Sequence, residues 1–323
     1  MSQIKYTVFV IAFFFNFICN AQYTDVINSN RPGESMSAFS VGKTVFQSEL
    51  GVSRFKEEHK TLNYKTVGNN FDVALRYGLF ASQFESILNL QIQSDTYKFG
   101  NNSYNRSGVK KLQFGFKALI LDPYKKLEKP DVYSWVRNNS FKWSQLIPAV
   151  AIYAGINLNF SDNPFFTGKQ EIIDPKVMLI TQNQFYGSQV FVTNFYADRI
   201  SSDDMNLGYI LTYTKGFNDH WSAFIENKGF KSKAYSDAIG TIGVAYLFKK
   251  STQIDVSISK SLKNTPSVLY GGVGFSWRFD KNYKEDKIQI KKLKKPKKKQ
   301  KVKPIETIPS AIPPDKVDPG KTP

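Results

Sequence analysis

Residue types that often carry chemistry are scarce in this sequence of 323 residues. Its single cysteine, Cys19, excludes a disulfide scaffold and a zinc site of the CxxC type. Its two histidines, His59 and His220, lie far apart and leave little for a histidine-bound metal cluster. We therefore expect no metal, no cofactor and no catalytic residue, and we predict that the protein is not an enzyme. An enzyme embedded in a membrane barrel, such as an outer-membrane acyl hydrolase, is the least favoured alternative.

Long apolar runs are missing beyond the N-terminus, which excludes a helical inner-membrane protein. At the N-terminus, Lys5 precedes a short apolar stretch from Val8 to Ile18, and small residues then stand before Gln22. This order predicts a signal peptide over residues 1–21. A lipoprotein would need a small residue in place of Ile18. The mature chain is therefore expected to be exported.

Acidic residues are few near the C-terminus, where residues 281–323 hold fourteen lysines, five carboxylates and seven of the fourteen prolines. This segment contributes +9 to the net charge of +17. Because it has almost nothing apolar to bury, we predict that residues 280–323 form a disordered basic, proline-rich periplasmic tail. Since an export signal precedes it, the expected partner is an anionic envelope polymer and not nucleic acid. A solvated tail without a specific partner stays open.

Period-2 alternation dominates the middle of the chain. From Phe71 to Leu79 the odd positions are large and apolar, whereas the even positions are Asp, Ala, Arg and Gly. A strand places such alternate side chains on opposite faces. The pattern is weaker in about half of the segments, and the registers of 175–183 and 189–197 are the least secure. We predict twelve strands, at 45–54, 71–79, 84–93, 111–120, 146–159, 175–183, 189–197, 206–214, 220–229, 238–248, 253–259 and 269–279.

Two architectures use alternating strands, a soluble sandwich with its apolar face inside and a transmembrane barrel with its apolar face towards lipid. Most of the predicted strands span about nine to twelve residues, a length that crosses a bilayer. Their polar faces are rich in small polar residues and in charges of both signs, which suits a lumen. We therefore predict an all-β transmembrane antiparallel β-barrel of about 12 strands over residues 43–279, in the outer membrane of a diderm bacterium.

Connection lengths also alternate along the chain. Short turns are expected at 80–83, 184–188, 217–219 and 249–251, and longer polar links at 55–69, 95–107, 161–171, 198–205 and 230–236. Outer-membrane barrels have short periplasmic turns and longer external loops, so both termini are expected in the periplasm. The segment 122–143 is long for the short-turn side. It is either a periplasmic element or a sign that the strand count is wrong.

Several short motifs resemble a known family. They are NRPGES at 30–35, QSELG at 47–51, LRYGL at 75–79, FGFK at 114–117 and GVGFSWRF at 272–279. In this order they resemble the "MetA-pathway of phenol degradation" proteins, a family of outer-membrane transporters. The resemblance covers about residues 28–279 and implies a barrel that transports small molecules. The chain departs from the family at Asn30, where Asp is usual, in the insertion at 122–143 and in its tail.

The polar face of the predicted strands carries nine charged residues that we expect to line the lumen. These are Glu49, Asp72, Arg76, Glu85, Lys111, Lys117, Glu226, Asp255 and Arg278. One hypothesis is that they line a selective passage, and the other is that they form a salt-bridge network that only packs the lumen. Residues 22–42 lack a strand pattern. They are expected to form a plug in which Arg31 meets lumen carboxylates, or else a flexible leader.

The sequence therefore predicts an outer-membrane channel for the passive passage of small, apolar molecules, with membrane lipid as its surroundings. The substrate is not identified by the sequence. The alternative is a structural barrel whose basic tail tethers the envelope.

Overall fold

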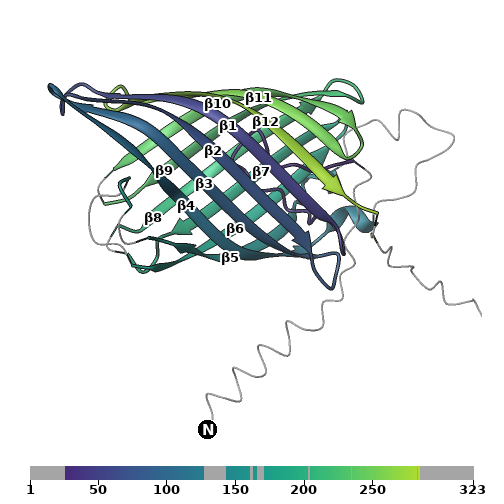
Figure 1. The fold of residues 1–323 in the computed structure, drawn as a ribbon. Coiled ribbons are helices and arrows are strands. Elements are labelled where there is room, and N and C mark those ends of the chain that lie inside the picture. The colour runs from purple at the N-terminus through teal and green to yellow at the C-terminus, as the bar shows by residue number, and fades with distance from the viewer. Residues whose placement is uncertain are drawn as a thin grey trace, which may run out of the picture. The chain divides into compact units, whose positions relative to one another are not determined.

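The computed structural model describes residues 26–126, 143–160, 163–165, 171–202, 204–233, 235–281 and 283, all within the unit Met1–Asp286. In these residues one sheet of twelve antiparallel strands closes on itself (Figure 1). This confirms the predicted fold class. The strands are β1 (Phe46–His59), β2 (Tyr64–Gly78), β3 (Phe84–Phe99), β4 (Asn102–Leu121), β5 (Ala149–Leu158), β6 (Ile173–Phe185), β7 (Gln189–Asp198), β8 (Asn206–Gly216), β9 (Trp221–Lys231), β10 (Ser236–Lys249), β11 (Thr252–Ser261) and β12 (Ser267–Phe279).

Each strand pairs with the next along the chain, and the barrel is closed between the first strand and the last. The β1–β12 register runs from Phe46 opposite Phe279 to Glu58 opposite Ser267. Closure gives the backbone amide and carbonyl groups partners within the sheet, which is the condition for spanning lipid with strands. No helix among the described residues is long and apolar enough to cross a bilayer.

The side chains of the barrel are arranged inside out relative to a soluble protein. On β10, Ile242 is 56% exposed while its neighbour Thr241 is 7% exposed, and on β4 Phe114 is 37% exposed while Gln113 is 2% exposed. A similar alternation is found on most strands, so that apolar side chains cover the outer surface and polar side chains fill much of the interior. A surface of this kind is suited to lipid and not to water.

Aromatic side chains are exposed at the strand ends nearest to residue 283, the end of the barrel that we call the terminal end. They include Tyr77, Phe80, Phe217, Trp221, Phe248 and Trp277. Such a belt is typical of the boundary between hydrocarbon and head groups. Phe230 of β9, by contrast, packs inside the barrel against a buried apolar cluster.

At the opposite end, which we call the hairpin end, the predicted long links 55–69 and 95–107 are wrong. β1 and β2 continue to a turn at 60–63, and β3 and β4 are joined by only two residues, of which Gly100 has a φ of 57° that favours glycine. The alternation fades there because neither face needs to be apolar, although the backbone ladder continues.

The described residues form twelve strands, as predicted, in spite of the long segment 122–143. Between β4 and β5 the structure has two short 3₁₀ helices, Pro123–Lys126 and Trp143–Leu146. The β4–β5 register is antiparallel, as for a direct neighbour. Residues 127–142, the predicted signal peptide at 1–21 and nearly all of the predicted tail at 280–323 lie outside the described residues.

The inside-out arrangement can be tested with one substitution placed on two adjacent residues of β11. Val256 is exposed on the outer face, whereas Ser257 faces the interior. Val256→Arg is expected to lower the free energy of unfolding in lipid vesicles by about 2–4 kcal/mol, because a guanidinium would face hydrocarbon. Ser257→Arg is the matched control and should cost much less. Equal costs at the two positions would contradict a lipid-facing outer surface.

Candidate functional site in the barrel lumen

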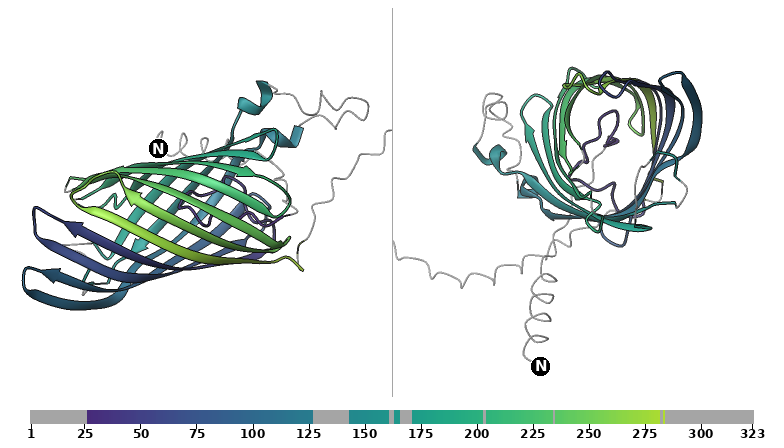
Figure 2. Two further views of the ribbon diagram at one scale, coloured as in Figure 1. Left: turned by 90° about the horizontal axis from the view of Figure 1, so that it is seen from above. Right: turned by 90° about the vertical axis from the view of Figure 1, so that its left-hand side faces the viewer.

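The chain before β1 runs inside the barrel. Residues 26–45, which we call the lumen segment, form no strand or helix, and Figure 2 (right) shows them within the ring of strands. Their backbone and side chains form hydrogen bonds with residues of strands all around the wall, from Glu49 on β1 to Arg278 on β12. Polar side chains of the wall therefore supply backbone hydrogen bonds that a neighbouring strand would supply in a sheet.

A cluster of four buried charges forms the centre of the wall on β1 to β4. Arg76 Nη2 lies 3.0 Å and 3.1 Å from the two carboxylate oxygens of Glu85, and Arg76 Nη1 lies 3.3 Å from Glu49 Oε1. Lys117 Nζ lies 2.7 Å from Glu85 Oε1. Three of these side chains are completely inaccessible to solvent, and that of Glu49 is 1% exposed. Two cations and two anions thus compensate each other where no solvent could.

The same cluster binds the lumen segment. Lys117 Nζ donates to the carbonyl oxygens of Ser37 (2.7 Å) and Phe39 (2.9 Å), and Arg76 Nη1 donates to that of Asn28 (2.8 Å). Glu85 Oε2 accepts a hydrogen bond from the Val41 amide (2.8 Å). The charges therefore have two tasks, because they neutralise each other and also fold the segment against the wall.

Carboxylate and amide side chains on the opposite wall hold the tip of the segment. Glu226 on β9 accepts hydrogen bonds from the consecutive amides of Glu34 (3.0 Å) and Ser35 (3.2 Å). Asn194 on β7 accepts from the Met36 amide (2.6 Å) and donates to the Met36 carbonyl (3.0 Å). An anion that receives successive backbone amides is a recurrent way to fix a turn. The segment thus spans the lumen from one wall to the other.

Arg31 lies over two glycines of the wall. Its Nη2 is 3.4 Å from Asp255 Oδ1, and Gln253 Nε2 donates to its carbonyl oxygen (3.2 Å). Beneath it, Gly51 and Gly274 are direct partners in the β1–β12 register. A Cβ added at either glycine would lie 2.2 Å from an Arg31 guanidinium nitrogen. The two glycines therefore make the room that the guanidinium occupies.

All nine charged wall residues singled out in the sequence lie on strands with their side chains on the inner face. Glu49, Arg76, Glu85 and Lys117 come together in one cluster. Glu226, Asp255 and Arg278 each contact the lumen segment elsewhere, Arg278 through the Val26 carbonyl (3.0 Å). Asp72 binds Gln91 instead (2.7 Å). Lys111 has no hydrogen bond or ion pair among the described residues.

The sequence did not anticipate that part of the interior is apolar. Ala151 and Tyr153 on β5 and Met178 and Ile180 on β6 are buried inside the barrel, where Phe39 of the segment joins their cluster. Both faces of these strands are apolar in places, which explains why their alternation is weak. Gln182 and Asn194 were also missed, although strict period-2 counting along the predicted strands would have put both on the inner face.

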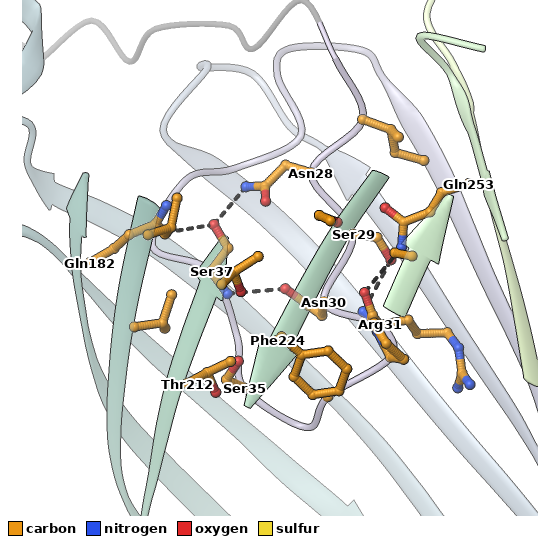
Figure 3. A pocket seen from close by; sticks show the side chains of 18 of the residues that line it. Asn28, Ser29, Asn30, Arg31, Ser35, Ser37, Gln182, Thr212, Phe224 and Gln253 are labelled. Atoms are coloured by element: carbon orange, nitrogen blue, oxygen red, sulfur yellow. Dashed lines mark hydrogen bonds between the residues drawn. The ribbon is translucent and has the colours of Figure 1, made fainter. Parts of the chain in front are cut away.

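A cavity of about 330 Å³ lies between the lumen segment and the wall formed by β6 to β11. Figure 3 shows Asn28 and Ser37 of the segment along it, with Gln182, Thr212 and Phe224 of the wall. Among the residues that line it, Arg31 is the one that carries a charge. A small and largely uncharged molecule matches this lining best.

The two histidines lie at ends of strands, His59 as the last residue of β1 and His220 just before β9. His59 Nδ1 accepts a hydrogen bond from the Leu62 amide (3.1 Å) at the hairpin end, and His220 Nδ1 lies 2.9 Å from the Leu247 carbonyl at the terminal end. Across the described part of the chain, no group of three or more His, Cys, Asp or Glu residues is arranged to hold a metal ion.

Comparison with known proteins relates the chain to a family and to a fold. The family model described as "Putative MetA-pathway of phenol degradation" matches residues 29–279. An outer membrane channel from Pseudomonas putida F1 is 8% identical with a TM-score of 0.52, over 78% of this chain and 100% of that one. The translocator domain of autotransporter NalP from Neisseria meningitidis is 11% identical with a TM-score of 0.44, over 74% and 90%. No curated protein matches significantly. At 8% identity, the first likeness supports the fold alone.

The buried cluster predicts a large effect of removing its central cation. Arg76→Met would leave Glu85 and Glu49 without their partner, and should lower the free energy of unfolding by about 3–5 kcal/mol. The control is Lys56→Met on the surface, because Lys56 forms an exposed ion pair with Glu58 (3.0 Å) worth no more than about 1 kcal/mol. Denaturant unfolding in detergent measures both. A cost below about 1 kcal/mol at Arg76 would contradict the proposed importance of the cluster.

Proposed function

Because the chain belongs to the "MetA-pathway of phenol degradation" family, which its motifs resemble, we propose that it is an outer-membrane channel for the passive passage of small molecules. The single observation that supports this most is the barrel itself, with an apolar outer surface and a polar interior that contains a cavity. A barrel of twelve strands is wider than its wall side chains can fill, so an interior path is compatible with this fold. Passage would follow the concentration gradient.

The lumen segment is proposed to be the constriction of this path. It crosses the lumen and is tied to opposite walls by Glu85 and Lys117 on one side and by Glu226 and Asn194 on the other. A segment bound through its own backbone can be released without unfolding the barrel, since the strand ladder does not depend on it. The charged wall residues would then both hold the constriction and set the field along the path.

The terminal end is proposed to face the periplasm. The connections at this end include the short turns at 186–188 and 250–251, whereas β1 to β4 extend beyond their neighbours at the hairpin end. An export signal at residues 1–21 and a basic tail after residue 280 are consistent with this orientation. Tall external hairpins and short periplasmic turns are the usual arrangement.

The position of the histidines supports the proposal that the protein is not an enzyme. His59 and His220 lie near opposite ends of the barrel, the first bound to the Leu62 amide and the second to the Leu247 carbonyl. General acid–base or nucleophilic catalysis would need a base within reach of a nucleophile.

A structural role remains the second candidate because of the sequence of the tail. Fourteen lysines in residues 281–323 would bind an anionic envelope polymer by charge alone. In that case the barrel would serve as the anchor and the tail as the tether.

Deletion of residues 26–38 tests the channel and its constriction together. The shortened protein should fold, because β1 to β12 are intact, and its single-channel conductance in planar bilayers should rise several-fold over that of the full chain. Glu226→Gln should give frequent transient openings, since the turn at Glu34 and Ser35 loses the carboxylate that binds it.

Deletion of residues 287–323 is the control and should leave conductance unchanged. A full chain and a deletion variant that both fail to conduct, although folded, would contradict the channel. Unchanged conductance after the first deletion would contradict the constriction.

A further inference from the structure

Four lysines point into the lumen on the hairpin-end side of Glu226. Lys110 and Lys111 come from β4, Lys176 from β6 and Lys228 from β9. The first two are neighbours in sequence and would normally lie on opposite faces. β4 has a β-bulge at this point. On β3, Gln91 pairs with Lys111 and the next residue, Ile92, pairs with Val109, so Lys110 is the extra residue of β4. Bulges of this kind redirect a side chain.

Two of these ammonium groups have no direct ion-pair partner on the described part of the wall. Lys110 and Lys111 form no hydrogen bond or ion pair among the described residues. Lys176 lies 3.7 Å from Asp198, a long contact for an ion pair. The carboxylate of Asp72, which accepts a hydrogen bond from Gln91, is also present in this part of the lumen, and the charges of Glu57 and Asp95 act on Lys110. The site therefore contains two ammonium groups, those of Lys110 and Lys111, that are not in direct contact with a carboxylate of the described residues.

Each of three lysines also lies over an aromatic ring on the inner wall. Lys110 Nζ is 5.8 Å from the centre of the Phe55 ring, Lys176 Nζ is 5.3 Å from that of Tyr196, and Lys228 Nζ is 6.0 Å from that of Phe230. Aromatic faces stabilise ammonium groups and exclude water from one side of them. The lysines are thereby held over apolar surface, where an anion binds more strongly than in open water.

One carboxylate already occupies this site. Glu34, at the tip of the lumen segment, places Oε2 2.6 Å from Lys228 Nζ, and Lys111 and Lys176 also stabilise its charge. The Glu34 side chain is 52% exposed to the lumen. Its backbone amide is held separately by Glu226. The carboxylate can therefore leave Lys228 while the segment stays in place.

We propose that the four lysines form a binding site for a small organic carboxylate, which competes with the side chain of Glu34 for Lys228. This inference rests on the proposed function, since the ligand would reach the site along the lumen. It adds a charged ligand class to that function. The cavity on the other side of the segment is lined mainly by uncharged groups and would not select for a carboxylate. Arrival of a carboxylate would also weaken one contact of the constriction.

Binding of sodium benzoate to the full-length protein in detergent, measured by titration calorimetry, tests the site. Glu34→Gln removes the competing carboxylate and should tighten binding about tenfold. Lys228→Gln should weaken it about tenfold or more. Lys65→Gln, on the exposed outer face of β2, is the matched control and should bind as the unaltered chain does. Benzyl alcohol, which has the same ring without the charge, should not respond to these substitutions.

Two results would overturn the inference: benzoate affinity that is the same in Lys228→Gln as in Lys65→Gln, and benzoate affinity that Glu34→Gln leaves unchanged or lowers. Glu34 belongs to no strand, so the second result holds even if Lys228→Gln fails to fold. The conductance of the 26–38 deletion does not depend on benzoate. Conduction without carboxylate binding would remove this inference and leave the channel, whereas binding without conduction would remove the channel.

Discussion

A strand within lipid has no solvent for its amide and carbonyl groups, so every other feature of this protein depends on the closure of the sheet between β1 and β12. Closure sends alternate side chains either to lipid or to one enclosed space. The apolar set therefore had to lie outside, and the charged set, which includes Arg76 and Glu85, had to share the interior. Charges that cannot reach bulk solvent must then find partners within a few ångströms.

The lumen segment supplies many of these partners. Lys117 uses two of its backbone carbonyls, and Glu85 and Glu226 use its amides. The usual difficulty of an irregular segment is its unpaired backbone, and the usual difficulty of a lumen is its unpaired charge. Here the charged side chains of the wall bind the backbone of the lumen segment, so each satisfies the unpaired groups of the other. The salt-bridge network and the lining of a passage are thus not exclusive alternatives, since one set of side chains neutralises itself and also positions the segment.

The interior differs from one part to another, and this bears on what could pass through. The Arg76 cluster is completely buried, β5 and β6 contribute an apolar patch, and three of the four lysines lie over aromatic rings. A molecule that moves from the hairpin end would meet the lysines first, then the segment, and then the weakly charged cavity. Under the proposed function, an amphipathic solute with one charged end and an apolar body would find a counterpart for each of its parts along this route.

The sequence by itself determined the barrel, its twelve strands and the face on which the nine selected charged residues lie, because period 2 is a local property of the backbone and lipid enforces it at every crossing. It failed where that constraint ends. At the hairpin end, strands continue through most of 55–69 and 95–107, where a regular apolar–polar alternation is missing, and at β5 the inner face is apolar as well. Only the tertiary structure decided which charges meet, since Arg76 and Glu85 are on neighbouring strands but Glu34 and Lys228 are 194 residues apart. Such contacts depend on the stagger of the strands around the barrel, on the bulge at Lys110 and on the path of the lumen segment, which has no periodicity. A local sequence pattern encodes none of these.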